Sequence, residues 1–290
     1  HAIISSLLQI PHLVVCINKM DLVDYSQEQY DKIKTEFEQF ASKLDVVDVS
    51  FIPISALNGD NVVSRSMNMS WYEGSTLMYY LENVHIASDH NLIDNRFPVQ
   101  YIIRPYSDEY HDYRGYAGRV AGGTFSVGDE VVALPSGFHS KIKSIQGPKG
   151  NQTDAIPPES VTILLEDDID ISRGDMIVRP NNQPEVTQDI DVMICWFDNN
   201  KSLLLRGKYV IRHSTQEARC IIKEIKYKLD IETLSRDQDN LEIKVNDIAR
   251  VMLRSTKPLF IDAYKQNRIT GSIILIDEAT NNTVGVGMVV

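Results

Sequence analysis

Apolar and polar positions follow two patterns over the first ninety residues, one typical of helices and one typical of strands. Short apolar runs rich in β-branched residues at 12–17 and 49–54 predict strands that are covered on both faces. Segments with helical spacing alternate with these runs. The predicted elements are, in order, a helix that ends before Pro11, the strand 12–17, a helix that begins after Ser26, the strand 49–54, and a helix over 75–84 with Ser75 as its N-cap.

The helix after Ser26 is marked by a capping box, because Gln29 follows Ser26 by three residues. Its buried side is expected to carry Tyr30, Ile33, Phe37 and Phe40. Alternating strands and helices predict a parallel sheet layered with helices. Two strands are too few for a stable sheet of this kind, so residues 1–90 are expected to be half of an α/β domain.

The pattern changes at about residue 96, where helical spacing gives way to short β-branched segments separated by Gly and Pro. Strands are expected at 97–104, 115–121, 130–134, 140–145, 161–165 and 175–178. After a polar linker at 181–187, strands are expected at 190–197, 208–213, 217–229, 247–253, 259–264, 271–277 and 285–289. Each all-β block is typical of a small antiparallel barrel, so domains are expected over 1–90, 96–180 and 188–290.

The composition is that of an ordinary globular protein, with 43% hydrophobic and 24% charged residues among 290. No apolar run approaches the roughly 18 residues that a membrane-spanning helix needs, so no membrane association is expected. The net charge of −11 argues against general nucleic-acid binding, because phosphate neutralisation supplies most non-specific affinity. Residues 186–290 are near neutral, and their clustered lysines, Lys223, Lys226 and Lys228, are expected on a solvated face.

The three cysteines, Cys16, Cys195 and Cys220, stand far apart and form no CxxC pair. This spacing excludes a disulfide framework and favours the reducing cytoplasm. All three are expected to be buried core thiols. The seven histidines show neither metal-ligand nor catalytic-triad spacing, so we expect no catalytic residue and no metal ligand within this chain.

The string Asn18-Lys19-Met20-Asp21 follows the first predicted strand, and it is suited to guanine recognition. The Asp21 carboxylate can accept hydrogen bonds from the ring N1–H and the 2-amino group of guanine, and adenine offers neither donor there. An unpaired, desolvated carboxylate would cost several kcal/mol, so discrimination is steep. Asn18 is expected to tie the loop together and reach the acceptor edge of the base. The aliphatic stem of Lys19 is expected to cover one face of the ring.

A second motif, Ser55-Ala56-Leu57, follows the next predicted strand. Loops at the carboxyl ends of parallel strands form the usual ligand edge of such sheets, so both motifs are expected at one edge. The backbone N–H of Ala56 could donate to the 6-oxygen of guanine. The alternative is a capped turn in which Asp21 merely satisfies backbone groups.

The guanine motifs followed by two barrels resemble the translation-factor class of GTPases, and the stretch 114–131 is similar to the second domain of that class. Several stretches narrow the resemblance to the large, GTP-binding subunit of heterodimeric sulfate adenylyltransferase. They are 58–63 (NGDNVV), 69–74 (MSWYEG), 136–137, 168–175 (DIDISRGD), 271–277 (GSIILID) and 283–288 (TVGVGM). The resemblance covers essentially the whole chain.

The resemblance implies a function. The enzyme makes adenylyl sulfate and pyrophosphate from ATP and sulfate, with ATP and sulfate bound by a small adenylyltransferase subunit. The large subunit hydrolyses GTP, which drives the otherwise unfavourable synthesis. By this resemblance the bound nucleotide is GTP, its Mg²⁺ ligands precede the NKxD string, and the partner is the small subunit of the heterodimer.

The chain departs from the family in one respect, because it contains no GxxxxGK[ST] string. The glycine-rich stretch 118–123 lacks the lysine and is expected to be a barrel turn. The switch threonine and the Asp-x-x-Gly string, which precede the NKxD string in the family, are also absent from residues 1–17. Because these elements precede the NKxD string in the family, and the chain begins at His1 rather than Met, we expect them upstream of His1. As given, the chain is expected to be a C-terminal fragment that cannot hydrolyse GTP and binds guanine nucleotides weakly or not at all.

Two rival interpretations stay open. The first is a translation elongation or initiation factor, whose third domain should offer tRNA a basic face. The second is a scaffold of paired barrels without a nucleotide function. The segment 106–116 carries four tyrosines among charges and includes His111, and it is either a partner contact or a solvated loop.

Overall fold

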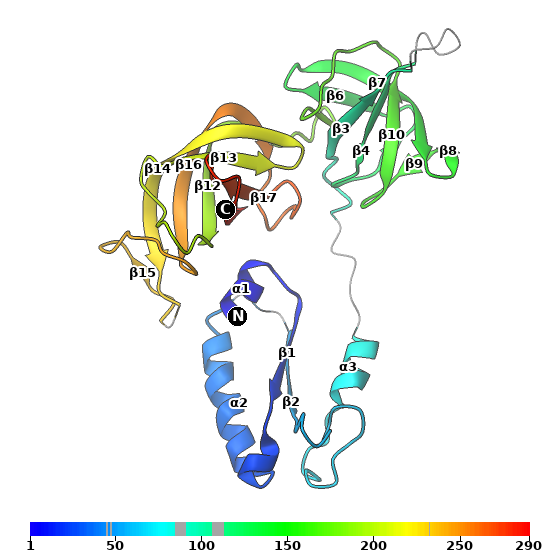
Figure 1. The fold of residues 1–290 in the computed structure, drawn as a ribbon. Helices are drawn as coiled ribbons and strands as arrows, with labels where there is room; N and C mark the ends of the chain where they lie inside the picture. Colours follow the sequence, from blue (N-terminus) through cyan, green and yellow to red (C-terminus); the bar gives the residue numbers. More distant parts are fainter. Residues whose placement is uncertain (45, 47, 85–90, 106–112, 232) are drawn as a thin grey trace. The chain divides into compact units, whose positions relative to one another are not determined.

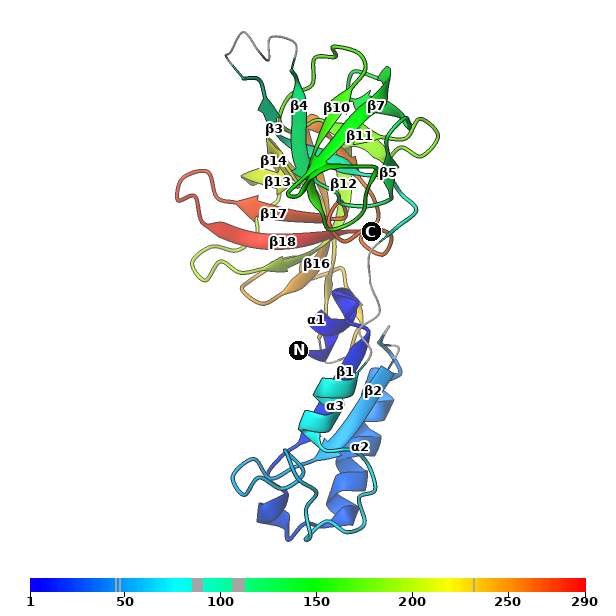
Figure 2. The ribbon, with the colours of Figure 1, turned by 90° about the vertical axis from the view of Figure 1, so that its right-hand side faces the viewer.

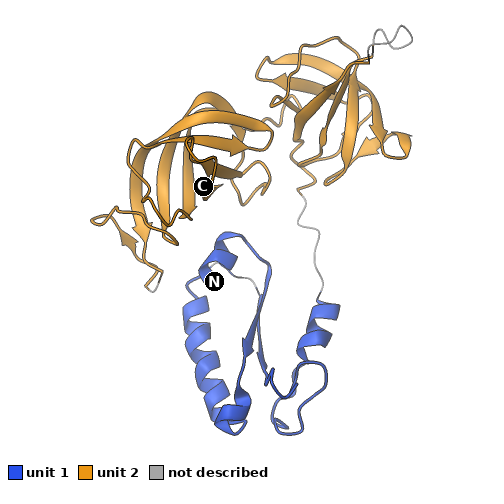
Figure 3. Ribbon diagram, viewed as in Figure 1, with its two compact units in different colours: residues 1–88 blue, residues 89–290 orange. Residues whose placement is uncertain are grey.

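The computed structural model describes residues 1–44, 46, 48–84, 91–105, 113–231 and 233–290. The chain forms two compact units, His1–Ser88 and Asp89–Val290, which Figure 3 draws in two colours. The segment 106–112, which holds His111 and most of the tyrosine-rich loop, lies outside the described residues. No helix among the described residues is long and apolar enough to cross a membrane.

The first unit is a two-stranded parallel sheet with helices on its faces. Its elements are α1 (Ala2–Leu7), β1 (His12–Ile17), the 3-10 helix η1 (Met20–Val23), α2 (Gln27–Ala41), β2 (Asp48–Pro53) and α3 (Leu77–Asn83). The strands pair in register from His12 with Asp48 to Ile17 with Pro53, so their carboxyl ends lie together. Figures 1 and 2 show α2 and α3 on opposite faces of this sheet.

The helix α2 begins as predicted, because Ser26 Oγ accepts a hydrogen bond from the Gln29 backbone N–H at 3.3 Å. Its predicted buried side is only partly correct. Tyr30 is buried and both phenylalanines are half-buried, but Ile33 is 43% exposed. The cap of α3 is Thr76 rather than Ser75, because the Thr76 hydroxyl accepts from the Tyr79 N–H at 3.4 Å.

The prediction that β1 is covered on both faces is wrong. Its residues His12–Cys16 are half-buried or exposed, and Cys16 is exposed, contrary to its assignment as a core thiol. Among the described residues β1 pairs with β2 alone, so less of its surface is covered than in the middle of a larger sheet. Cys195 and Cys220 are buried, as predicted.

The second unit begins with a closed antiparallel barrel, drawn green in Figure 1. The strands of this part of the chain are β3 (Phe97–Ile103), β4 (Gly115–Arg119), β5 (Phe125–Ser126), β6 (Glu130–Leu134), β7 (Phe138–Gly147), β8 (Gly150–Gln152), β9 (Asp154–Ala155), β10 (Ser160–Leu165) and β11 (Met176–Val178). The order β10-β4-β3-β11-β6-β7 closes where β7 pairs with β10, so six of the described strands form the barrel.

The same unit contains a second closed barrel, yellow to red in Figure 1. Its strands are β12 (Glu185–Trp196), β13 (Lys208–His213), β14 (Gln216–Leu229), β15 (Arg236–Asp237), β16 (Ile248–Ile261), β17 (Ser272–Ile276) and β18 (Thr283–Val289). The order β13-β17-β18-β12-β16-β14 closes where β13 pairs with β14. Within the described ranges six strands again close the barrel, around a core that includes Trp196, Ile211 and Leu253.

Two strands predicted at 247–253 and 259–264 are the single long strand β16. Its pairing with β12 is interrupted between Arg254 and Leu259, where the register shifts by a bulge. Pro258 has no N–H to donate, and it lies within this interruption, which is the place in a sheet that tolerates proline. The proline therefore marks a bulge rather than a strand end.

The two barrels share a buried polar junction. Arg96, 1% exposed and directly before β3, forms a two-pronged ion pair with Asp262, with Nε–Oδ2 and Nη2–Oδ1 distances of 2.8 Å. The Nη1 group of Arg96 donates to the Asn182 carbonyl oxygen at 2.7 Å and to its side-chain oxygen at 2.8 Å. An apolar cluster that joins Phe260 to Val132 and Met176 lies in the same unit.

Candidate guanine-nucleotide site

The loop that carries Asn18, Lys19 and Asp21 leaves the carboxyl end of β1 and turns sharply. Lys19 adopts a left-handed conformation with φ of 66°, after which η1 begins at Met20. Met20 is 1% exposed, and its N–H donates to the Ile54 carbonyl oxygen at 3.2 Å. The loop is thereby fixed to the end of β2, where the second motif begins.

The two motifs meet through their side chains. Ser55, which is fully buried, donates from its hydroxyl to Asp21 Oδ1 at 2.7 Å. The same hydroxyl oxygen accepts from the Asn58 backbone N–H at 3.3 Å. Ser55 thus holds one oxygen of the Asp21 carboxylate in a fixed direction. The hydrogen-bond partner of Asp21 is thus a side chain of the neighbouring loop rather than a backbone group of its own turn.

Asn18 connects the loops a second time. Its Oδ1 accepts from the Lys19 N–H at 2.7 Å and from the Ala56 N–H at 3.0 Å. Asn18, Lys19 and Ala56 are exposed, and the Leu57 side chain is 87% exposed. The structure therefore brings Asn18, Asp21, Ser55 and Ala56 together. The Ala56 N–H, which the sequence suggested as a donor to guanine, is engaged with Asn18 here.

An apolar cluster contains residues from this loop and from the elements beside it. Ile17, Met20, Tyr30 and Met69 are buried in it, and Trp71 and Tyr72 pack against it. The Tyr30 ring lies 5.2 Å from the Trp71 ring and 6.2 Å from the Tyr72 ring, measured between centroids. Burial, together with the neighbouring Tyr72 and acidic groups, raises the pKa of Tyr30 to about 12, so this hydroxyl stays protonated.

Sequence reasoning missed Tyr25, which lies at the end of the same loop. Its hydroxyl donates to Asp60 Oδ2 at 3.1 Å and accepts from Asn58 Nδ2 at 3.2 Å. Its carbonyl oxygen accepts from Trp71 Nε1 at 3.0 Å. These partners lie in the stretches 58–63 and 69–74 that carried the family resemblance, but no local pattern pairs them with Tyr25.

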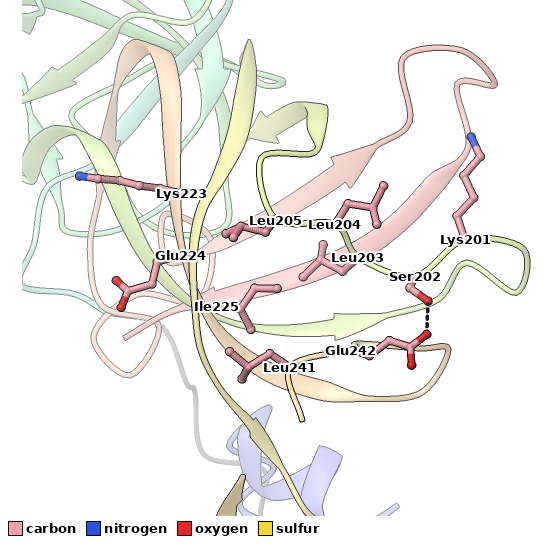
Figure 4. A pocket seen from close by; sticks show the side chains of 10 residues that line it. All are labelled: Lys201, Ser202, Leu203, Leu204, Leu205, Lys223, Glu224, Ile225, Leu241 and Glu242. Atoms are coloured by element: carbon pink, nitrogen blue, oxygen red, sulfur yellow. Dashed lines mark hydrogen bonds between the residues drawn. The ribbon is translucent and has the colours of Figure 1, made fainter. Parts of the chain in front are cut away.

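Concavities also lie on the barrels. One of about 690 Å³ is lined by Lys201, Ser202, Leu203, Leu204, Leu205, Lys223, Glu224, Ile225, Leu241 and Glu242. Figure 4 shows the leucines and Ile225 that line this concavity, and the hydrogen bond that Ser202 donates to Glu242. Within the part of the chain that the structure describes, no group of three or more His, Cys, Asp or Glu side chains could hold a metal ion.

Comparisons with known proteins agree with this geometry. Residues 1–95 match the model of the elongation factor Tu GTP binding domain, and residues 189–290 match that of the GTP-eEF1A C-terminal domain-like family. Crystal structures of Sup35 complexed with GMPPNP (TM-score 0.62, 22% identity, all of this chain and 71% of that one) and of translation elongation factor SelB from Methanococcus maripaludis (TM-score 0.57, 17% identity, all of this chain and 60% of that one) share the fold.

These matches and the two closed barrels show the fold of the translation-factor class of GTPases, as predicted. The bifunctional enzyme CysN/CysC of Mycobacterium tuberculosis is 51% identical over the whole chain and 47% of its own length. Sulfate adenylyltransferase subunit 1 of Bacteroides thetaiotaomicron is 46% identical over the whole chain and 60% of its own length. Over its full length the chain is therefore a homologue of sulfate adenylyltransferase subunit 1 and CysN. It spans about half of the first relative and three fifths of the second.

Proposed function

We propose that this chain supplies the guanine-recognising loops of a GTP-binding subunit of sulfate adenylyltransferase. The observation that carries the proposal is the full-length similarity, 46% to a sulfate adenylyltransferase subunit 1 and 51% to a CysN/CysC enzyme. A translation-factor function is not favoured, because the likeness to Sup35 and SelB is 22% and 17% in identity and concerns the fold alone.

The proposed base contacts are made by the two loops at the carboxyl ends of β1 and β2. Asp21 accepts from N1–H and the 2-amino group of guanine, while Ser55 keeps the carboxylate oriented. The Ala56 N–H exchanges its bond to Asn18 for one to the 6-oxygen of the base. In this proposal the Lys19 stem and the Leu57 side chain, both exposed, cover the ring. We assign to this chain the contacts to the base alone.

The proposed ligand is GTP with Mg²⁺. Hydrolysis of GTP drives the formation of adenylyl sulfate and pyrophosphate from ATP and sulfate, which bind to a small adenylyltransferase subunit. The two subunits form a heterodimer that works in the cytoplasm. The names of the relatives support the reaction and the word "subunit" in them supports a partner chain.

The proposal is tested with the variant Asp21→Asn in the protein expressed from its complete natural gene together with its small subunit. Asparagine offers an amide N–H to the 2-oxygen of xanthine, so the variant should lose GTP-dependent pyrophosphate release from ATP and sulfate. Xanthosine triphosphate should restore it, with the preference shifted by at least about tenfold. The matched control is Asp24→Asn, an exposed acid in the same loop that should leave the preference unchanged. An Asp21→Asn variant that still prefers GTP would exclude the proposed base contact.

Pyrophosphate release by the wild-type pair that is independent of added GTP would exclude the proposed coupling. Tight binding of aminoacyl-tRNA in place of a small subunit would instead support a translation factor.

A further inference from the structure

We propose that Tyr25 is a positioning residue for guanine recognition, which holds the Asp21 loop in place by joining it to the segment 58–71. The inference rests on the proposed function and adds a specificity-determining role for residues outside the base-contacting motifs. Tyr25 does not touch the base in this proposal. It acts through Asn58, Ser55 and the turn of η1 on the direction of the Asp21 carboxylate.

The backbone around Tyr25 is unusual. Asp24 and Tyr25 both adopt left-handed conformations, with φ of 50° and 57°. A bulky side chain seldom adopts this conformation, and it persists where surrounding contacts hold it. The Tyr25 N–H closes the turn by donating to the Met20 carbonyl oxygen at 2.8 Å. The turn therefore places Tyr25 and Asp21 close together, and contacts to Tyr25 constrain Asp21.

Hydrogen bonds connect the Tyr25 hydroxyl to Asp21 through two residues. Asp21 is bonded to the Ser55 hydroxyl, which accepts from the Asn58 backbone N–H at 3.3 Å, and the Asn58 side chain donates to the Tyr25 hydroxyl at 3.2 Å. The backbone between Asp21 and Tyr25 joins the two ends of this hydrogen-bonded network. The Asp21 carboxylate is therefore held by the Ser55 hydroxyl and, through the backbone, by the contacts of Tyr25.

The segment 58–71 is itself held firmly. Asp60, which accepts from the Tyr25 hydroxyl, also accepts from the Ser66 hydroxyl at 2.5 Å. Trp71 donates from its indole N–H to the Tyr25 carbonyl oxygen and packs on the Tyr30 ring. The segment thus forms a rigid outer support against which the loop rests.

The direction of the carboxylate decides which base is preferred. Two hydrogen bonds to the N1–H and 2-amino groups require both carboxylate oxygens to lie in the plane of the base. Hypoxanthine lacks the 2-amino group and uses only the first bond. A loop that rotates slightly would therefore lose affinity for guanine more than for hypoxanthine. This difference separates a positioning role from a general role in stability.

The test compares GDP and IDP binding by calorimetry, with the protein expressed from its complete natural gene. Tyr25→Phe removes only the hydroxyl, and Asn58→Ala removes the bridging amide of an exposed side chain. Both variants should bind GDP about five- to tenfold more weakly and IDP nearly as well as the wild type, because one net hydrogen bond is at stake. The matched control is Tyr79→Phe, whose side chain is 61% exposed and which should change neither affinity.

The outcomes separate the two proposals. A wild-type protein that binds GDP and IDP equally would refute the base recognition proposed above. A wild-type protein that prefers GDP, with Tyr25→Phe and Asn58→Ala retaining the same GDP-to-IDP ratio, would overturn the role of Tyr25 alone. If Tyr25→Phe loses its native circular dichroism, the ratio measured for Asn58→Ala decides the question.

Discussion

The ion pair between Arg96 and Asp262 should make a large contribution to the stability of the two-barrel unit. Arg96 donates five hydrogen bonds, two of them to Asp262. The variant Arg96→Met keeps an apolar stem but leaves the Asp262 carboxylate, 7% exposed, with the Thr270 hydroxyl as its remaining side-chain donor among the described residues. Leaving one buried charge without its partner costs about 3–5 kcal/mol.

This cost predicts a fall in melting temperature of roughly 6–20 °C for a unit of about 200 residues. The assay is unfolding followed by tryptophan fluorescence in a Trp71→Phe background. Trp196 is then the single tryptophan, and it is buried in the second barrel. The control is Arg212→Met, which removes an exposed pair with Glu217 and should cost no more than about 1 kcal/mol.

The double variant Arg96→Met/Asp262→Leu sharpens the test. If the cost of Arg96→Met comes from the isolated carboxylate, removing that carboxylate as well should restore part of the lost stability, because an apolar replacement of a buried pair is often neutral. Additive losses in the double variant, or a loss below about 1 kcal/mol for Arg96→Met, would refute this account of the junction.

Two further predictions concern buried titratable groups. Burial lowers the pKa of His213, whose Nε2 lies 2.8 Å from the Thr270 carbonyl oxygen. The unfolded chain therefore binds the proton more readily, and the unfolding free energy falls as the pH drops below about 6.5. In His213→Asn this pH dependence of the unfolding free energy should be flatter, by at most about 1.4 kcal/mol per pH unit. An unchanged pH slope in His213→Asn would contradict this. Burial raises the pKa of all three thiols, that of Cys220 to about 12, and Cys195 and Cys220 are buried whereas Cys16 is exposed. A thiol reagent at pH 8 should therefore modify Cys16, slowly, and leave the other two thiols of the native chain unmodified. Rapid labelling that persists in Cys16→Ser would show that a barrel opens.

Much of the fold follows from local patterns. The strands β1, β6 and β13 have the predicted bounds, because short apolar segments and the turn residues that flank them determine these bounds locally. The merging of two predicted strands into β16 did not follow from the sequence, because proline is typical of strand ends as well as of bulges. The pairing with the neighbouring strand β12 decides that Pro258 lies in a bulge. The exposure of Cys16 depends on how many strands lie beside β1, which an apolar run does not reveal.

The site was predictable to the extent that it depends on topology. Two motifs that follow parallel strands must meet at one sheet edge, and the bond between Ser55 and Asp21 places them there. The partner of the Ala56 N–H was not predictable, because Asn18 and a base can both accept its hydrogen. Tyr25 was not predictable either, since its contact with Trp71 joins residues 46 positions apart and no periodic pattern pairs them.

If the loop binds guanine as proposed, the arrangement around Tyr25 separates two tasks. Asn18, Lys19 and Ala56 are exposed, so they can exchange partners when the proposed contact with the base forms. Asp21 must not change direction, because discrimination depends on two simultaneous hydrogen bonds. Ser55 is fully buried and Tyr25 is held by three hydrogen bonds to the segment 58–71, so the contacts that fix the carboxylate are separate from the exposed groups proposed to meet the base. Substitutions of Ser55, Tyr25 or Asn58 should therefore alter the ratio of guanine to hypoxanthine affinity, whereas substitutions of Asn18 or Lys19 should alter affinity for these two bases alike, because the two share the 6-oxygen and the ring.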